Sequence, residues 1–322
     1  FTGLPCFSTE HAFDEQIVER VNAGHIPDIR RAEECTYFYN NCWRHPEYVK
    51  LDFGDQFQMI CDAISQVNKK EYKEIKLLEV GCGPGYMSLE LAREGFDVTG
   101  LDLSKKCIEV AKSFADDDPW KEERGNLQYL IDDFLSPDKL ELNSFDFIIF
   151  VGALHHFPDQ EGVCSQCRKL LKANGFIIAI EPARDRVTRG NAIIFNLIQT
   201  LLSAGKGYYS KVPVPATVEE QKEQITRTFN FLRYEDGDGE KVQSINDNEA
   251  GYDDMLTALN NSFTKVYFKE LYGLFHELIG GLRFDQNTNN LLARYIRDMD
   301  KELCELGVVQ ATEFIYVGQA PE

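Results

Sequence analysis

The chain has 322 residues, of which 43% are apolar and 27% are charged, and its formal net charge at pH 7 is −19. A chain of this length buries roughly three quarters of its unfolded surface, so it needs no disulfide or metal to be stable, and the composition excludes a disordered protein. The acidic excess opposes binding to a polyphosphate, so we expect a small-molecule partner and no nucleic acid.

Residues 1–72 are predicted to be mainly helical, because their apolar side chains recur at helical spacing. From residue 75 onward, short apolar strands alternate with helices, which is typical of a parallel sheet covered by helices on both faces. The expected strands of this part are Ile75–Val80, Phe96–Leu103, Leu127–Asp132, Phe145–Val151 and Phe176–Glu181. The expected helices between them are Pro84–Glu94, Ser104–Ala115 and Gly162–Leu171.

After residue 182 the pattern becomes mostly helical. The expected helices are Asn191–Leu202, Val218–Leu232, Tyr252–Asn260, Glu270–Leu282 and Asn287–Leu306, and the expected strands are Phe263–Lys269 and Thr312–Val317. We therefore predict an α/β fold with a Rossmann-like, doubly wound, mostly parallel seven-stranded sheet, a helical N-terminal segment and helical insertions near the C-terminus. The predicted divisions are a helical lid (1–72), a core (73–182), a mostly helical substrate cap that includes strand six (183–310), and a last core strand with a tail (311–322).

The chain carries no apolar run of about 18 residues, so no transmembrane segment is predicted. Its nine cysteines are irregularly spaced and odd in number, which favours reduced thiols in a reducing compartment. Cys164 and Cys167 form a C-x-x-C pair without a second pair of ligands, so no metal is expected. We expect a cytoplasmic protein, a monomer or a homodimer. The numbering begins with Phe1 rather than Met, which leaves room for an upstream segment.

A glycine-rich loop, Glu79-Val-Gly-Cys-Gly-Pro-Gly85, follows the first strand. Glycine allows the backbone to approach a nucleotide closely, and the carboxyl end of a strand is where doubly wound sheets bind ligands. Asp102 ends the second strand, where an acid accepts hydrogen bonds from a ribose. The dinucleotide fingerprint requires Gly or Ala at position 86, where this chain has Tyr86. Glu79 would repel a phosphate, but it suits a cation such as the ammonium of a methionine moiety.

Two further motifs extend the pattern: Asp132-Asp-Phe134 after the third strand, and Phe145-Asp-Phe-Ile-Ile149 leading to Ala153-Leu-His-His156. Together with the glycine loop and Asp102, they resemble the class I S-adenosylmethionine-dependent methyltransferases. The subgroup that they most resemble comprises small-molecule enzymes related to the ubiquinone biosynthesis methyltransferases. The resemblance covers residues 75–182, with a weaker similarity at 252–269 and 312–318. Lys172-Ala-Asn-Gly175 departs from the usual Lys-Pro-Gly-Gly of these enzymes, which affects only a turn.

The resemblance implies S-adenosylmethionine as cofactor and S-adenosylhomocysteine as product. The positions that match cofactor contacts of the family are Glu79, Gly81, Cys82, Gly83, Gly85, Asp102, Leu103, Asp133, Phe134, Gly152 and Ala153. Glu79 and the glycine loop would surround the amino-acid end of the cofactor. Asp102 would bind the ribose, and Leu103 would pack on the adenine. Asp133, or alternatively Asp132, would accept from the adenine amino group. Gly152 and Ala153 would pass close to the sulfonium.

Three residues are candidates for the chemistry at the methyl acceptor: His156, His155 and Glu181. A base is needed only when the acceptor must lose a proton, and histidine takes up a proton near neutral pH. Structural roles remain open for both histidines. Glu181 has the alternative of pairing with Arg184 or Arg186.

Aromatic residues are candidates for the walls of the site. Tyr37, Tyr39 and Trp43 would form a lid over the cofactor, whereas Tyr208 and Tyr209 would line the acceptor pocket. Apolar helices at 191–202 and 270–284 would enclose a hydrophobic acceptor, although the first of them could instead dock on a membrane surface or a second subunit.

The expected function is methyl transfer to a small, hydrophobic or aromatic acceptor, with O- or C-methylation favoured. The alternatives are a non-catalytic regulatory protein that binds S-adenosylmethionine and a nicotinamide-dependent oxidoreductase.

Overall fold

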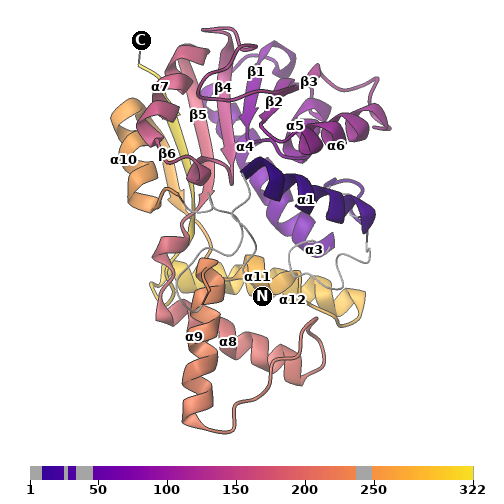
Figure 1. The fold of residues 1–322 in the computed structure, drawn as a ribbon, viewed down its shortest axis with the longest axis vertical. Helices are drawn as coiled ribbons and strands as arrows, with labels where there is room; N and C mark the ends of the chain where they lie inside the picture. Colours follow the sequence, from indigo (N-terminus) through magenta and orange to yellow (C-terminus); the bar gives the residue numbers. More distant parts are fainter. Residues whose placement is uncertain (1–8, 25–27, 34–45, 237–248, 322) are drawn as a thin grey trace.

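The computed structural model describes residues 9–24, 28–33, 46–236 and 249–321. Within these residues the chain forms a seven-stranded sheet in the order β3-β2-β1-β4-β5-β7-β6 (Figure 1). The strands are β1 (Lys76–Val80), β2 (Asp97–Asp102), β3 (Leu127–Ile131), β4 (Phe145–Val151), β5 (Leu171–Pro182), β6 (Thr264–Glu270) and β7 (Glu313–Gln319). The first five are parallel, whereas β7 runs antiparallel to both β5 and β6. The predicted α/β fold with a mostly parallel seven-stranded sheet is therefore confirmed.

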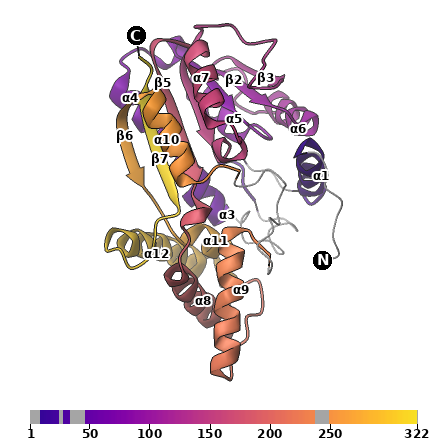
Figure 2. The same ribbon diagram turned by 60° about the vertical axis from the view of Figure 1, so that its left-hand side comes forward.

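Helices cover both faces of the sheet (Figures 1 and 2). On one face lie α4 (Gly54–Val67), α5 (Tyr86–Arg93) and α6 (Lys105–Asp116), and on the other lie α7 (Gln160–Leu170) and α10 (Tyr252–Ser262). Successive side chains of a strand point to opposite faces. In β4, Ile148 and Phe150 therefore pack with α7, whereas Phe147 and Ile149 pack with α4 and α5.

The remaining α-helices lie before β1, between β5 and β6, or between β6 and β7. They are α1 (Thr9–Asn22), α3 (Pro46–Tyr48), α8 (Arg189–Ala204), α9 (Val218–Arg233), α11 (Phe275–Ile279) and α12 (Gln286–Glu305), together with the π-helical turn η1 (Val49–Phe53) and the 3₁₀ turns η2 (Tyr72–Glu74), η3 (Leu154–His156) and η4 (Arg184–Arg186). Helices α8, α9, α11 and α12 share an apolar cluster of their own, with residues of α3 and η1 beside it. They form a helical cap at one end of the sheet (Figures 1 and 2).

The predicted helix Glu270–Leu282 is wrong over its first part. Strand β6 continues to Glu270, and the N–H of Leu271 still donates to the carbonyl of Glu313. Tyr272 then accepts from the N–H of Thr312, so the chain remains tied to the β7 side and the helix begins at Phe275. Pairing at the sheet edge thus overrides the local helical pattern.

In the described residues, no helix combines the length and the apolar character needed to cross a membrane.

Candidate functional site

A cavity of about 450 Å³ lies at the carboxyl ends of β1, β2 and β4. It is lined by most of the positions predicted from sequence: Glu79, Gly81, Cys82, Gly83, Asp102, Leu103, Asp133, Phe134, Gly152, Ala153 and His156. Segments far apart in the sequence converge there because the carboxyl ends of parallel strands share one edge of the sheet.

Gly85 is the exception among the predicted loop residues. It does not line the cavity, and its backbone has φ +78°, which places it before the first turn of α5. A Cβ here would lie 2.5 Å from the hydroxyl of Tyr129 and 2.7 Å from the Cβ of Ala111. The glycine is needed because the loop packs tightly against β3 and α6.

Glu79 lies in the cavity wall with 4% of its surface exposed. The hydroxyl of Ser88 donates to its carboxylate. Burial raises the pKa of Glu79 to about 7, although the Ser88 hydrogen bond acts in the opposite direction and the charge of Asp102 raises the pKa further. A buried carboxylate in the wall of a cavity is suited to a positively charged ligand group.

Asp102 connects the glycine loop to the start of α6. Its Oδ2 accepts from the N–H of Gly83 at 2.8 Å, and its Oδ1 accepts from the N–H of Ser104 at 2.7 Å. Burial raises the pKa of Asp102, and these two backbone N–H groups oppose the shift. Ser104 is the N-cap of α6, as predicted, and accepts from the N–H of Cys107 at 3.0 Å.

Asp132 and Asp133 both line the cavity, but they organise different parts of the loop after β3. Asp132 accepts from the N–H groups of Asp138 and Lys139 at 3.1 and 3.0 Å. Asp133 accepts from the N–H of Leu135 at 2.9 Å and from the hydroxyl of Ser136 at 3.1 Å. The prediction that Asp133 rather than Asp132 meets the ligand stays a prediction.

Two glycines leave room for a ligand against the backbone. Gly83 has φ +51° and Gly152 has φ +58°, and a Cβ built on either would meet no protein atom within 4 Å. Both line the cavity, so side chains here would project into open space where the backbone now offers a bare surface. The cradle and the buried carboxylate of Glu79 fit a nucleoside joined to a cationic amino-acid tail, as S-adenosylmethionine is.

The two histidines of η3 have different environments. His156 is half-buried and lines the cavity, whereas His155 is buried behind it, with the two ring centroids 4.0 Å apart. His155 Nδ1 lies 2.8 Å from Glu181 Oε2. Glu181 also accepts from the N–H groups of Ala153 and Leu154 at 3.0 and 2.8 Å.

His155 and Glu181, which were predicted to act at the methyl acceptor, do not line the cavity. Glu181 is fully buried, and its carboxylate holds the loop that carries His156. Of the two arginines considered as partners of Glu181, Arg184 pairs with Glu277 and Arg186 pairs with Glu270.

Of the aromatic residues predicted as walls of the site, Tyr208 and Tyr209 do not line this cavity. The hydroxyl of Tyr208 donates to the carbonyl of Glu277 within the helical cap, because the segment after α8 folds onto α11. Tyr37, Tyr39 and Trp43 lie outside the described residues.

Sequence analysis missed the residues that close the cavity from the N-terminal side. Ile17 and Arg20 of α1 and Phe53 of η1 line it, and no sequence motif connects these helices to the glycine loop. Tyr86 and Met87 also line it, and their position directly after Gly85 was a usable signal. Helix α1 lies beside α6 in Figures 1 and 2, where Asp14 accepts from the hydroxyl of Ser104.

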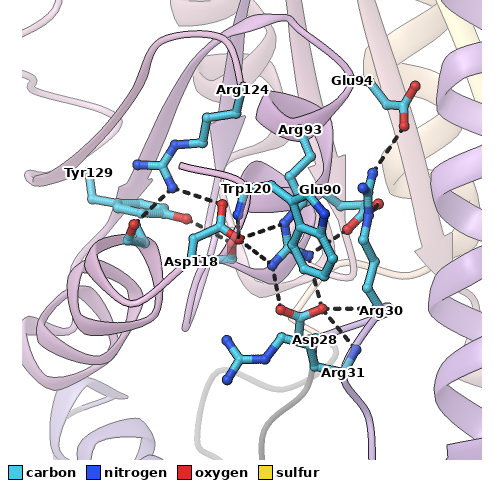
Figure 3. A network of polar contacts seen from close by, with 12 residues as sticks. Asp28, Arg30, Arg31, Glu90, Arg93, Glu94, Asp118, Trp120, Arg124 and Tyr129 are labelled. Carbon is cyan, nitrogen blue, oxygen red and sulfur yellow. Dashed lines mark hydrogen bonds and ion pairs between the residues drawn. The ribbon is translucent and has the colours of Figure 1, made fainter. Parts of the chain in front are cut away.

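A buried ionic cluster anchors the segment that follows α1 (Figure 3). The side chain of Arg93, on α5, is 1% exposed and ion-pairs with Asp28, Glu90 and Asp118 at 2.6, 2.9 and 2.9 Å. Its guanidinium also lies 4.7 Å from the ring centroid of Trp120. Asp28 lies six residues after the end of α1, so the cluster ties the segment that follows this helix to α5.

Among the described residues, no group of three or more His, Cys, Asp or Glu side chains is arranged to hold a metal ion.

Comparisons with known proteins agree with this geometry. Residues 78–179 match the family described as a methyltransferase domain. The chain is 38% identical over 120 residues to a ubiquinone biosynthesis O-methyltransferase of Pelagibacter ubique, covering 37% of this chain and 47% of that protein. It is 33% identical over 102 residues to the protein of the same name from Photobacterium profundum, covering 32% and 41%. The chain thus spans less than half the length of these curated relatives.

Among solved structures, the cyclase SpnF superposes with a TM-score of 0.53 at 12% identity, covering 99% of both chains, which shows the shared fold. The resemblance of the core to class I S-adenosylmethionine-dependent methyltransferases is confirmed.

Proposed function

We propose that this chain, whose residues 78–179 form a class I S-adenosylmethionine-dependent methyltransferase domain, transfers a methyl group to a hydroxyl of a small apolar or aromatic molecule. The observation that carries the proposal is a single cavity whose wall holds the buried Glu79 carboxylate, the glycine cradle and His156. The O-methyltransferases among the relatives support the choice of oxygen as the methyl acceptor.

The residues of the cavity divide into those for the cofactor and those for the acceptor. Glu79 would accept from the ammonium, Asp102 from the ribose hydroxyls and Asp133 from the adenine amino group, with Leu103 against the adenine ring. Leu103 is 47% exposed, which supports a role as a platform that a planar ligand covers.

S-adenosylmethionine supplies a methyl group that is already activated by a positively charged sulfur. The protein therefore mainly has to hold the acceptor oxygen in line and take its proton. His156 is proposed to accept that proton, and Glu181 and His155 are proposed to position it through the loop that they hold. Phe53 and Phe157 line the same cavity, which supports an acceptor with apolar or aromatic surface.

S-adenosylhomocysteine is expected to bind more tightly at pH 8 than at pH 6. The Glu79 carboxylate must be charged to meet the ammonium, and its pKa of about 7 leaves it mostly protonated at pH 6 and mostly ionised at pH 8. The affinity should rise by up to about tenfold over this range, because the ionised fraction rises from roughly a tenth to nine tenths. Isothermal titration calorimetry at both pH values measures the change.

The matched variant is Glu79→Gln. Its amide can still form a hydrogen bond with Ser88, but it carries no group that titrates between pH 6 and pH 8. It should bind more weakly at pH 8 and show no rise with pH. Saturable binding of NAD without binding of S-adenosylhomocysteine would overturn the assignment of the cofactor.

His156→Asn is expected to lower turnover by about 10²- to 10⁴-fold, the contribution typical of a general base. The assay follows transfer of labelled methyl from S-adenosylmethionine to a panel of phenols and catechols with apolar substituents. The affinity for S-adenosylhomocysteine should not change, since the proposed role of His156 is toward the acceptor.

Undiminished turnover by His156→Asn would show that His156 is not the general base, but it would not contradict the proposed methyl transfer. Tight cofactor binding without methyl transfer to any member of a broad acceptor library would instead favour a regulatory protein that binds S-adenosylmethionine.

A further inference from the structure

Two helices of the cap expose apolar side chains in regular stripes. On α8 and on α12 the exposed residues recur every four positions, so each set lies along one face of its helix. The members of the two stripes are Ile193, Leu197 and Leu201 on α8 and Leu291, Tyr295 and Met299 on α12. They are between 39% and 64% exposed. We call these six residues the α8/α12 face.

The two stripes border a common groove of about 330 Å³. Leu201, Tyr295 and Met299 line it, and its floor is formed by leucine and isoleucine residues of α8, α11 and α12. Asp300 is the acidic residue of the lining, and its carboxylate already accepts from the N–H groups at residues 273–275. Apart from Asp300 and the hydroxyl of Tyr295 the lining is apolar, so the groove is suited to apolar side chains.

The exposed apolar area of this face matches what a dimer requires. Six large side chains that are each about half exposed leave on the order of 500 Å² of apolar surface uncovered. Each partner contributes roughly 800 Å² to a stable interface, and about 65% of a homodimer interface is apolar, so this face supplies the apolar part of such an interface.

Charge also favours one type of partner. Helix α8 carries no acidic residue and, after Arg189 at its start, no basic residue, in a chain with a net charge of −19. An anionic membrane would repel such a chain, since the stripes contain no lysine or arginine to attract it. Two acidic copies would meet with the least repulsion across α8, which is uncharged after Arg189, whereas α12 also carries residues of both charges.

We propose that the α8/α12 face is the interface of a two-fold symmetric dimer of this chain. In such an interface the same surface of both copies meets, so the α8 and α12 helices of the two copies would pack as a four-helix arrangement. No residue of α8 or α12 lines the cofactor cavity, so both cavities of the dimer stay open. This inference does not depend on the proposed reaction.

Sedimentation velocity of the full chain across a range of micromolar concentrations tests the proposal. The wild-type chain should sediment as a dimer, and Leu197→Asp/Tyr295→Asp should raise the dissociation constant by at least ~100-fold, as expected when two central contacts are lost. The control is Leu142→Asp, because Leu142 is 64% exposed but lies in the loop before β4, away from this face. Higher salt should strengthen the wild-type dimer, because it screens the repulsion between two acidic copies.

Circular dichroism and binding of S-adenosylhomocysteine verify that the double variant remains folded. A monomeric wild-type chain at high micromolar concentration would overturn the proposal, as would equal dissociation of the Leu142→Asp control. A monomer that cosediments with neutral phosphatidylcholine vesicles through these residues would also overturn it and assign the face to a lipid surface.

Discussion

Arg93→Met is expected to lower the free energy of unfolding by about 3–5 kcal/mol, the cost of removing one partner from a buried ion pair. The substitution leaves Asp28, Glu90 and Asp118 close together, and the side chains of all three are at most 6% exposed. Glu90 would keep Arg30 and Asp118 would keep Arg124, but Asp28 would lose its arginine partner. A carboxylate buried without its cation must either keep an uncompensated charge or take up a proton. Denaturant unfolding followed by circular dichroism measures the loss.

The nearby Arg30 provides a matched control. It also pairs with Glu90, at 2.6 Å, but its side chain is 31% exposed, so Arg30→Met should cost about 1 kcal/mol or less. Arg93→Lys keeps the charge without the forked geometry and should recover part of the stability. If Arg93→Met and Arg30→Met lowered the free energy of unfolding equally, burial of Arg93 would not make its ion pairs more stabilising than those of Arg30.

Arg93→Met should also weaken binding of S-adenosylhomocysteine in the fraction that folds. Asp28 closely follows α1, the helix that places Ile17 and Arg20 on the cavity. When the anchor is lost, part of the binding free energy must be used to order this segment again.

His276→Gln is expected to be comparably destabilising, by about 3–5 kcal/mol at pH 6–7. His276 on α11 lies between two carboxylates, with Nδ1 2.9 Å from Asp52 of η1 and Nε2 2.5 Å from Glu313 of β7. Because these three residues come from the cap, the N-terminal region and the sheet, the histidine joins three parts of the fold. Without its positive charge the two acids would repel each other in a buried position.

This triad also makes stability depend on pH. Burial alone would lower the pKa of His276, but the charges of Glu313 and Asp52 outweigh burial and raise it well above its usual value. Burial raises the pKa of Glu313 as well. A raised pKa means that the folded protein holds its proton more firmly than the unfolded chain does. The contribution of His276 is therefore complete below about pH 6.5 and is lost as the pH rises through the folded pKa.

Denaturant unfolding at a series of pH values from 6 to 9 checks the direction of this pH dependence of stability. The free energy of unfolding of the wild-type chain should fall toward high pH relative to that of His276→Gln, by at most about 1.4 kcal/mol per pH unit for one proton. The triple variant Asp52→Asn/His276→Gln/Glu313→Gln should recover much of the stability, because it removes the buried charges together. Parallel pH profiles for the wild-type chain and His276→Gln would show that the triad does not titrate as described.

The parts of the fold that were predicted correctly are those encoded by local pattern. The alternation of apolar strands and helices after residue 75 predicted the parallel core, and Ser104 marked the start of α6. The helix predicted from Glu270 failed because pairing of the sheet edge with β7 decided the backbone there. Helical spacing is a property of the segment itself, whereas an edge pairing depends on a strand some forty residues further along the chain.

The same distinction applies within the site. Glycines and acids at strand ends are local signals, and Glu79, Gly83, Asp102 and Gly152 all reach the cavity. Glu181 carried the same signal, yet its carboxylate faces the loop of Ala153 and Leu154 instead of the cavity. The end of a strand places a residue at the edge of the sheet, but it does not decide where the side chain of that residue points. That direction depends on which nearby backbone N–H groups the carboxylate accepts from.

By itself, therefore, the sequence determined the order of strands and helices, the class of the core and the set of residues at its carboxyl edge, because each depends on periodicity or on the spacing of a motif. Only the tertiary structure decided that α1 and η1 close the cavity, that Gly85 serves packing, and that Asp28 and Asp52 meet Arg93 and His276. These contacts join segments that are far apart in the chain, and their energies come from burial and charge compensation, which no local pattern records.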